Sequence, residues 1–212
     1  MGWLADQVHL APTTSLKVRG HLRNHLLPKF GPMRLSSIQP RDVRSWIAEA
    51  SRQGVAPNTI RAISSTLGRI VKTAVRDGLI GRSPCDGVEM PRAGVAAEMR
   101  FLTAAEVVRL AEAIDRRYRA AIYLAAYSGL RWGELAALRP ERLDLDRGFV
   151  EVRESLADVS GQLLVQPPKS GKVRSVSLPD FVCDVLEVHV AEFPDARYVF
   201  TSPGGGPLRR SN

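Results

Sequence analysis

Cysteine is nearly absent from this sequence of 212 residues, and long apolar runs are missing altogether. The two cysteines, Cys85 and Cys183, have no close Cys or His partner in the sequence, which argues against a zinc knuckle or a disulfide framework. We interpret both as small apolar core residues. No stretch approaches the roughly 20 apolar residues of a membrane helix, and residues 1–6 lack the features of a signal peptide. A cytoplasmic protein with no membrane partner is therefore expected.

Acidic residues are scarce in the first part of the chain, so the charge is unevenly distributed. Residues 1–97 hold 14 Lys and Arg against 6 Asp and Glu, whereas residues 98–212 hold 16 of each class. The whole net charge of +8 therefore belongs to the first part. A basic lobe joined to a neutral one is typical of nucleic-acid-binding proteins, because neutralising phosphates releases counterions.

Apolar residues recur at helical spacing before residue 79, which predicts a small helical domain. A first helix, running through Leu26, is expected to be ended by Pro28, Gly31 and Pro32. Two further helices are expected to begin near Pro40 and Pro57. Outside its apolar stripe, the last of these helices carries the four cations that we predict to bind DNA: Arg61, Arg69, Lys72 and Arg76.

Proline and glycine interrupt residues 79–97, which show no helical period and are predicted to be a linker. The domains are therefore expected at residues 1–78 and 98–212. The second domain opens with two helical patterns. A capping box formed by Thr103 and Glu106 marks the start of the first of these helices. Beyond these helices the period becomes strand-like, which predicts three antiparallel strands at residues 149–152, 163–165 and 173–178, followed by one more helix. The predicted fold class is mainly α with a small antiparallel β-sheet (α+β).

Arg131 stands just after a turn between two helical patterns. Ser128 and Gly129 end the first helix, and Leu135 begins the apolar side of the second. Glu134 lies one helical turn beyond Arg131, where its carboxylate can restrict the orientation of the guanidinium. The corner therefore predicts a cation held in a fixed direction. The alternative is a buried Arg-Glu pair that only ties two helices together.

A second group of cations lies between the last two predicted strands. Lys169 is placed at a strand end and Lys172 in the turn that follows, so we expect both near the tip of a hairpin. An ammonium group there can meet a phosphate, or donate a proton to a leaving alkoxide if neighbouring cations lower its pKa. The alternative is a solvated turn.

Together these motifs resemble the tyrosine recombinase, or phage integrase, family. Residues 128–135, which read Ser-Gly-Leu-Arg-x-x-Glu-Leu, resemble the first arginine box of the family. The segment Pro168-Lys169-Ser170, ahead of residues 174–178, resembles its β-hairpin lysine. The resemblance covers nearly the whole chain and implies a SAM-like helical core-binding domain followed by an integrase-type catalytic domain. The partner it implies is double-stranded DNA.

The resemblance implies a reaction that needs no metal or other cofactor. In the family, a tyrosine attacks a DNA phosphodiester, forms a 3′-phosphotyrosyl link and releases a 5′-hydroxyl, and the reverse reaction joins a different strand. Arg131 would stabilise charge on the non-bridging phosphate oxygens, and Glu134 would hold the corner in place. Lys169 would be the general acid, with Lys172 as the alternative. The intact protein is expected to act as a homo-oligomer, a tetramer, on DNA at the bacterial nucleoid.

The other catalytic groups of the family are missing from this sequence. No histidine is followed three residues later by arginine, and all the tyrosines precede the place where the family has its nucleophile: Tyr118, Tyr123, Tyr127 and Tyr198. We interpret each tyrosine as a packing residue. The chain is therefore expected to be the N-terminal part of a truncated recombinase that binds DNA and is inactive alone.

Three functions remain open at this stage. The first is part of an integrase that cuts and rejoins DNA at specific sites when intact. The second is a non-catalytic DNA-binding remnant that blocks recombination sites. The third is a helical scaffold whose charge only keeps it soluble, and this one predicts no steep dependence of DNA binding on salt.

Overall fold

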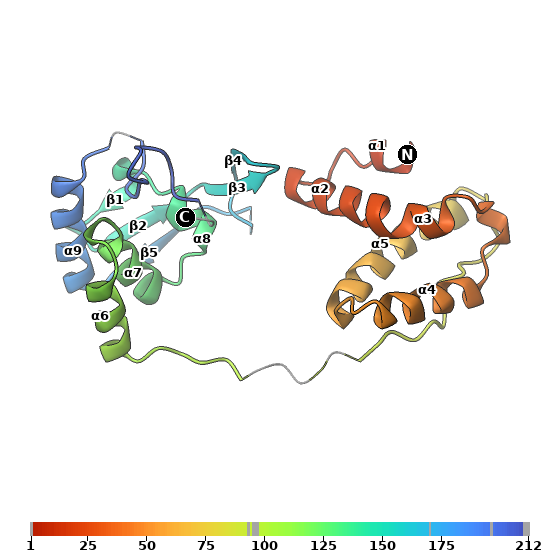
Figure 1. Ribbon diagram of the computed structural model, residues 1–212. Helices are drawn as coiled ribbons and strands as arrows, with labels where there is room; N and C mark the ends of the chain where they lie inside the picture. The colour runs from red at the N-terminus through yellow and green to blue at the C-terminus, as the bar shows by residue number, and fades with distance from the viewer. Residues whose placement is uncertain (1, 93, 95–97, 170, 196, 210–212) are drawn as a thin grey trace. The chain divides into compact units, whose positions relative to one another are not determined.

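The computed structural model describes residues 2–92, 94, 98–169, 171–195 and 197–209. The chain forms two compact units, Met1–Glu98 and Met99–Asn212. Figure 1 shows the helices and strands of each unit. Each unit folds around its own hydrophobic core. The described residues include no helix that is long and apolar enough to cross a membrane.

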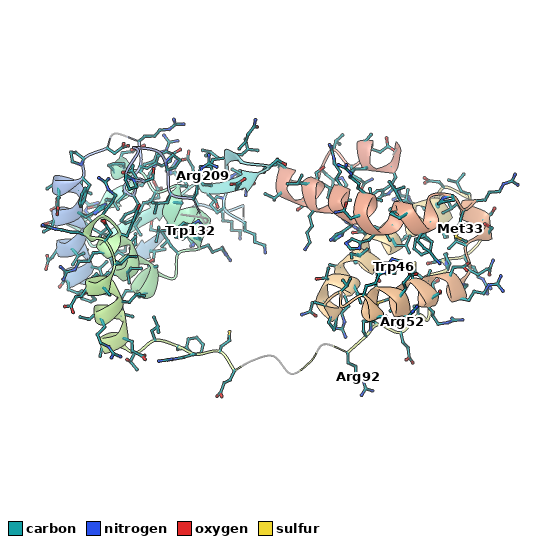
Figure 2. The ribbon with its side chains drawn as sticks, viewed as in Figure 1. Met33, Trp46, Arg52, Arg92, Trp132 and Arg209 are labelled. Carbon is teal, nitrogen blue, oxygen red and sulfur yellow. The ribbon has the colours of Figure 1, made fainter. Side chains whose placement is uncertain are left out.

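The first unit is helical, as its sequence pattern predicts. Its elements are α1 (Gly2–Ala5), α2 (Pro12–His21), the π-helix η1 (Leu22–Leu26), α3 (Leu27–Phe30), the short 3₁₀ helix η2 (Leu35–Ser37), α4 (Pro40–Arg52) and α5 (Pro57–Arg76). Helices α4 and α5 begin at Pro40 and Pro57, because proline has no N–H to lose in a first turn and its φ suits a helix. Ile60, Ile63 and Val71 of α5 are fully buried. Trp46 of α4 lies among the helices of this unit (Figure 2).

The first helix ends at Phe30, directly before Gly31 of the predicted stop, but Pro28 does not end it. The chain widens into the π-turn of η1 and continues as α3 through Pro28 to Phe30. A proline inside a helix removes one hydrogen bond and crowds the carbonyl four residues earlier. The π-turn changes the hydrogen-bonding pattern just before this point, and Pro28 falls in the first turn of α3, where proline is tolerated.

Much of the predicted linker packs on the first unit. Ile80, Cys85, Val88 and Met90 contact the core of the helices. The Arg61 side chain donates two hydrogen bonds to the carbonyl of Pro91, from Nε at 3.2 Å and Nη2 at 3.0 Å. Residues 93 and 95–97 of that linker lie outside the described part of the chain.

The second unit combines helices with two small sheets. Its elements are α6 (Ala104–Ala113), α7 (Arg116–Ser128), α8 (Trp132–Ala136), η3 (Pro140–Arg142), β1 (Leu143–Asp144), β2 (Phe149–Val152), β3 (Ser155–Val159), β4 (Gln162–Gln166), β5 (Arg174–Ser177) and α9 (Asp180–Glu192). The predicted capping box at the start of α6 is present, since Thr103 and Glu106 exchange hydrogen bonds. The predicted fold class, mainly α with a small antiparallel sheet, is confirmed.

The strand pairing differs from the predicted one. Strands β1, β2 and β5 form one antiparallel sheet, and β3 and β4 form a separate hairpin. The hairpin turns at Ser160 and Gly161, which both have positive φ, as a two-residue type I′ turn requires. The expected hairpin that carries Lys169 and Lys172 is therefore wrong, because β4 pairs with β3 and β5 pairs with β2.

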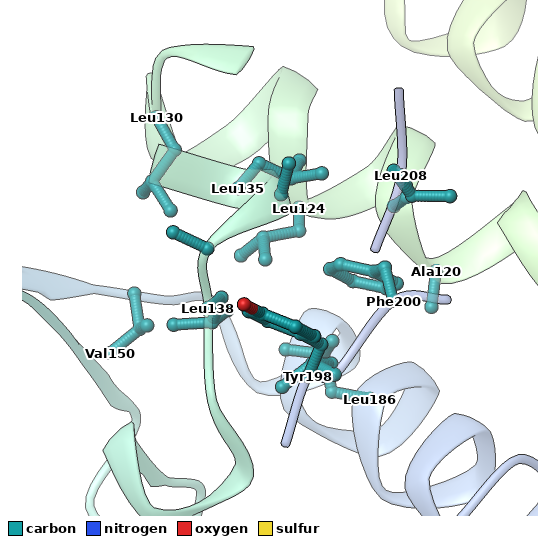
Figure 3. Close-up of a cluster of buried hydrophobic side chains, with 14 of the residues drawn as sticks. Ala120, Leu124, Leu130, Leu135, Leu138, Val150, Leu186, Tyr198, Phe200 and Leu208 are labelled. Carbon is teal, nitrogen blue, oxygen red and sulfur yellow. The ribbon is translucent and has the colours of Figure 1, made fainter. Parts of the chain in front are cut away.

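The core of the second unit gathers side chains from distant parts of its sequence. Leu124 of α7, Leu135 of α8 and Leu186 of α9 are buried together. Tyr198 and Phe200, from the segment after α9, lie among them (Figure 3). This packing fixes the positions of α7 and α8, and so of the corner between them.

Candidate phosphate-binding site

The corner between α7 and α8 is held by a glycine cap and a buried leucine. Helix α7 ends at Ser128, and Gly129 adopts the left-handed conformation with φ 63°. The Ser128 hydroxyl donates to the Leu124 carbonyl and accepts from the Leu130 amide. The Leu130 side chain is buried, and Arg131, next in the chain, is the N-cap of α8. The backbone of Arg131 is thus fixed, while its side chain is 57% exposed.

Glu134 binds two arginines at once. Its side chain is 1% exposed. Its Oε1 accepts hydrogen bonds from Nη1 of Arg131 at 3.2 Å and from Nη1 of Arg174 at 3.0 Å. Its Oε2 accepts from the Arg131 backbone N–H at 2.9 Å and from Nη2 of Arg174 at 2.7 Å. The predicted contact between Glu134 and Arg131 is therefore present, and Arg174 joins it from the first residue of β5.

These contacts keep the buried carboxylate charged. Burial by itself would raise the pKa of Glu134, since it disfavours the ionised form. The hydrogen bonds from Arg174 and Arg131, together with the charge of Arg174, outweigh burial, so the pKa of Glu134 lies below its usual value. The hydrogen bond to Glu134 in turn raises the pKa of Arg174. The Glu134 carboxylate is therefore charged, and with two guanidinium groups, which carry a positive charge throughout in proteins, the net charge of the three side chains is +1.

Gly133 allows helix α8 to lie directly against strand β3. A Cβ atom at this position would stand 2.5 Å from Oγ of Ser155 and 2.6 Å from the carbonyl oxygen of Leu156, closer than atoms can approach. The side chain of the preceding residue, Trp132, is exposed. The packing of α8 on β3 therefore requires glycine at position 133.

The two predicted lysines lie in the connection between β4 and β5. Lys169 and Lys172 are both exposed, and the connection turns at Gly171, whose amide donates to the Pro168 carbonyl. Ser170 of the predicted motif lies outside the described residues. Within the part of the chain that the structure describes, Lys169 makes no hydrogen bond or ion pair. The connection ends at Arg174, and so at the Glu134 corner.

The four predicted DNA-binding residues of α5 differ in their surroundings. Arg61 is engaged with the Pro91 carbonyl, and the guanidinium of Arg69 lies over the ring of Trp3 at 5.8 Å. Arg76 is 77% exposed beside Asp77. Lys72 has no hydrogen bond or ion pair with any residue that the structure describes. Lys72 and Arg76 are thus the least engaged of the four.

Arg174 was not identified from the sequence as a site residue. In the sequence it was only the first residue of segment 174–178, which reads Arg-x-Val-x-Leu and follows the predicted lysines. The one available signal was an arginine at the start of a strand, directly after a segment with two lysines. Its pairing with a glutamate 40 positions earlier depends on tertiary packing. Among the described residues, no group of three or more His, Cys, Asp or Glu is placed to hold a metal ion.

Comparison with known proteins identifies the family. Residues 100–212, just over half of the chain, match the Phage integrase family. The chain belongs to the phage integrase family. Residues 2–51 match a second family, the N-terminal SAM-like domain of phage integrases. The resemblance stated from the sequence motifs is thereby confirmed.

Individual integrases resemble the chain over most of its length. It is 33% identical to the putative prophage phiRv2 integrase of Mycobacterium tuberculosis over 89% of the chain and 50% of that protein. It is 29% identical to the integrase of Mycobacterium phage L5, over 95% of the chain and 56% of that protein. The chain thus spans about half the length of these curated relatives.

Solved integrase structures share the fold. The Tn1549 transposon integrase in complex with transposon right end DNA matches 99% of the chain and 72% of that solved chain, with a TM-score of 0.89 and 18% identity. A lambda integrase tetramer bound to a Holliday junction matches 98% of the chain and 59% of that protein, with a TM-score of 0.74 and 17% identity.

Replacing Glu134 by Gln is expected to destabilise the second unit by about 2 kcal/mol at neutral pH, because an amide NH₂ would face arginine donors in a buried position. This loss of stability should become smaller as the pH is lowered. The pKa of Glu134 is depressed in the folded chain, so its stabilising effect is present above the unfolded carboxyl pKa and is lost as pH falls through the folded one. Denaturant unfolding at several pH values measures this difference.

Glu187→Gln is the matched control, since Glu187 is an exposed glutamate of α9. It should change the free energy of unfolding by no more than about 0.5 kcal/mol. Equal effects of the two substitutions would contradict the structural role assigned to Glu134.

Proposed function

We propose that this chain binds duplex DNA and supplies part of the phosphodiester-binding site of a site-specific recombinase. The observation that carries the proposal is the exposed Arg131 guanidinium on a fixed backbone, restrained by a carboxylate that is itself saturated with hydrogen bonds. A preformed cation of this kind suits a group on which negative charge develops. The family membership supports the same chemistry, and the similar Tn1549 and lambda integrases were solved on DNA.

In this proposal Arg131 binds the non-bridging oxygens of the scissile phosphate, and Glu134 fixes its orientation. Lys169 is the general acid that protonates the leaving 5′-oxygen. Its exposed position in the β4–β5 connection, with no hydrogen bond or ion pair to another described residue, leaves it available for that role. Lys172 is the alternative proton donor. No step of the proposal requires a metal or other cofactor.

We assign residues 1–78 as a core-binding domain, 79–97 as the linker and 98–212 as the first part of a catalytic domain. The charge distribution supports this division, because the whole excess of positive charge belongs to residues 1–97. Lys72 and Arg76 are the proposed phosphate contacts of α5 with the fewest competing interactions. Arg61 and Arg69 contribute charge to the same helix while they also contact Pro91 and Trp3.

The chain as it stands is proposed to bind DNA without cutting it. Tyr123 and Tyr198 are buried, and Tyr118 packs at the edge of the core. Tyr127 packs edge-on against Phe181 with ring centroids 4.9 Å apart. Tyr127 is the only exposed tyrosine of the four, at 36%, and its ring is packed on Phe181, while the other three are at least partly buried. An intact protein with a nucleophilic tyrosine would complete the reaction, as a tetramer like that of lambda integrase on its Holliday junction. A non-catalytic remnant that blocks recombination sites is the alternative.

DNA affinity is expected to fall steeply with salt, and Arg76→Gln is expected to lower the slope of log Kd against log salt by about 1, the loss of one phosphate contact. Arg147→Gln is the matched control. Both arginines are highly exposed, at 77% and 81%, and each lies near an aspartate, but Arg147 belongs to the nearly neutral second unit. Fluorescence anisotropy with a labelled duplex measures both slopes. Affinity that hardly changes with salt would instead support a scaffold function.

A nicked duplex that traps covalent intermediates is expected to give no protein-DNA adduct with this chain. The reason is that the four tyrosines all serve packing, and that Arg131 and Lys169 cannot replace the covalent step. Denaturing electrophoresis after incubation detects any adduct. An adduct that survives denaturant would contradict the proposal, and peptide mapping would then show which tyrosine had reacted.

A further inference from the structure

The hydrogen bonds of Glu134 leave it no free acceptor position. A carboxylate has about four lone-pair positions, two on each oxygen. Arg174 occupies one position on each oxygen through a bidentate, or two-pronged, contact in which Nη1 donates at 3.0 Å and Nη2 at 2.7 Å. The Arg131 backbone N–H and its Nη1 take the other two. The side chain of Arg131 is therefore restricted to a single hydrogen bond with Glu134, the longest of the four at 3.2 Å.

This restriction matters because arginine and carboxylate otherwise pair through two parallel bonds. With Arg174 in place, the two-pronged geometry is already occupied by the more shielded arginine, whose side chain is 34% exposed against 57% for Arg131. Four of the five N–H donors of Arg131 remain outside the contact with Glu134. The charge balance also favours an available Arg131. Arg131 and Glu134 alone would be neutral, whereas the two arginines and Glu134 together carry a net charge of +1.

The position of Arg174 is set by the sheet. It is the first residue of β5 and lies opposite Val152 in the antiparallel pairing with β2. Val152 is buried in the core of the second unit. Arg174 thus reaches Glu134 from a strand whose register is fixed by its pairing with β2.

We propose that Arg174 is a positioning residue, which occupies Glu134 in two-pronged fashion and so keeps the Arg131 guanidinium available for a DNA phosphate. Arg174 acts through Glu134 and not by its own contact with DNA. This inference rests on the proposed role of Arg131 in phosphate binding. A simple ion pair that ties β5 to α8 would instead need only the charge of Arg174.

The test uses the full chain with Arg174→Lys, which keeps the charge but loses the planar fork. Arg153→Lys is the matched control, because Arg153 is a half-exposed arginine of the same unit that pairs with Glu151 and not with Glu134. Circular dichroism establishes that each variant is folded. If Arg174→Lys is unfolded, Arg174→Gln takes its place in the test. The affinity for a short labelled duplex is measured at one low salt concentration, with Arg131 present and with Arg131→Ala.

The expected result is a non-additive loss. Arg131→Ala should weaken binding about tenfold, the effect of one charge-assisted hydrogen bond. Arg174→Lys should weaken binding by a similar factor when Arg131 is present and cause no further loss when residue 131 is alanine. Arg153→Lys should leave the affinity unchanged. An Arg174→Lys variant with wild-type affinity, or with the same loss in both backgrounds, would overturn the inference.

A second readout needs no DNA and separates this inference from the proposed function. In nuclear magnetic resonance spectra of the free chain, Arg174→Lys should shift the side-chain Nε–H signal of Arg131, because Arg131 then forms a second bond to Glu134. Arg153→Lys should not shift it. An unchanged signal in the folded Arg174→Lys variant would overturn the inference. If Arg131→Ala leaves DNA affinity unaltered while the signal shifts as expected, the proposed phosphate role fails and the positioning geometry stands.

Discussion

The second unit is organised around one buried carboxylate. Glu134 joins three parts of the chain, namely the corner after α7, the first turn of α8 and the start of β5. A buried charge is tolerated only when it is paired and its lone pairs are satisfied, and Glu134 meets both conditions through two arginines. The packing of α8 on β3, which depends on Gly133, brings this carboxylate to its place. Exposed positive charge at Arg131 is the consequence.

The two units contribute different kinds of electrostatic interaction. The first carries +7 of the chain's net charge of +8, since residues 1–98 hold 14 Lys and Arg against 7 Asp and Glu. This excess suits a sequence-independent attraction to phosphates. The second is nearly neutral, with 16 Lys and Arg against 15 Asp and Glu. Its cations are mostly paired with carboxylates, as in the contacts of Arg139 with Glu154 and of Arg142 with Glu151. Against that background, the +1 corner at Arg131 is a local feature that packing creates.

Local patterns in the sequence predict much of this fold. Helices α4 and α5 follow from apolar spacing and from proline in the first turn, and the corner at Arg131 follows from a glycine stop. The pairing of β4 with β3 was missed, because strand periodicity gives no partner and the weakly patterned β3 was not recognised. Arg174 was missed for a related reason. Its contact with Glu134 joins residues 40 positions apart and depends on the register of β5 against β2.

A crystal structure of this chain with duplex DNA tests the central claim most directly. The account predicts a non-bridging phosphate oxygen about 3 Å from a guanidinium nitrogen of Arg131. Arg174 should keep its two-pronged contact with Glu134 in that complex. A complex in which DNA is bound while Arg131 contacts no phosphate, or turns inward to pair with Glu134 through two bonds, would contradict it.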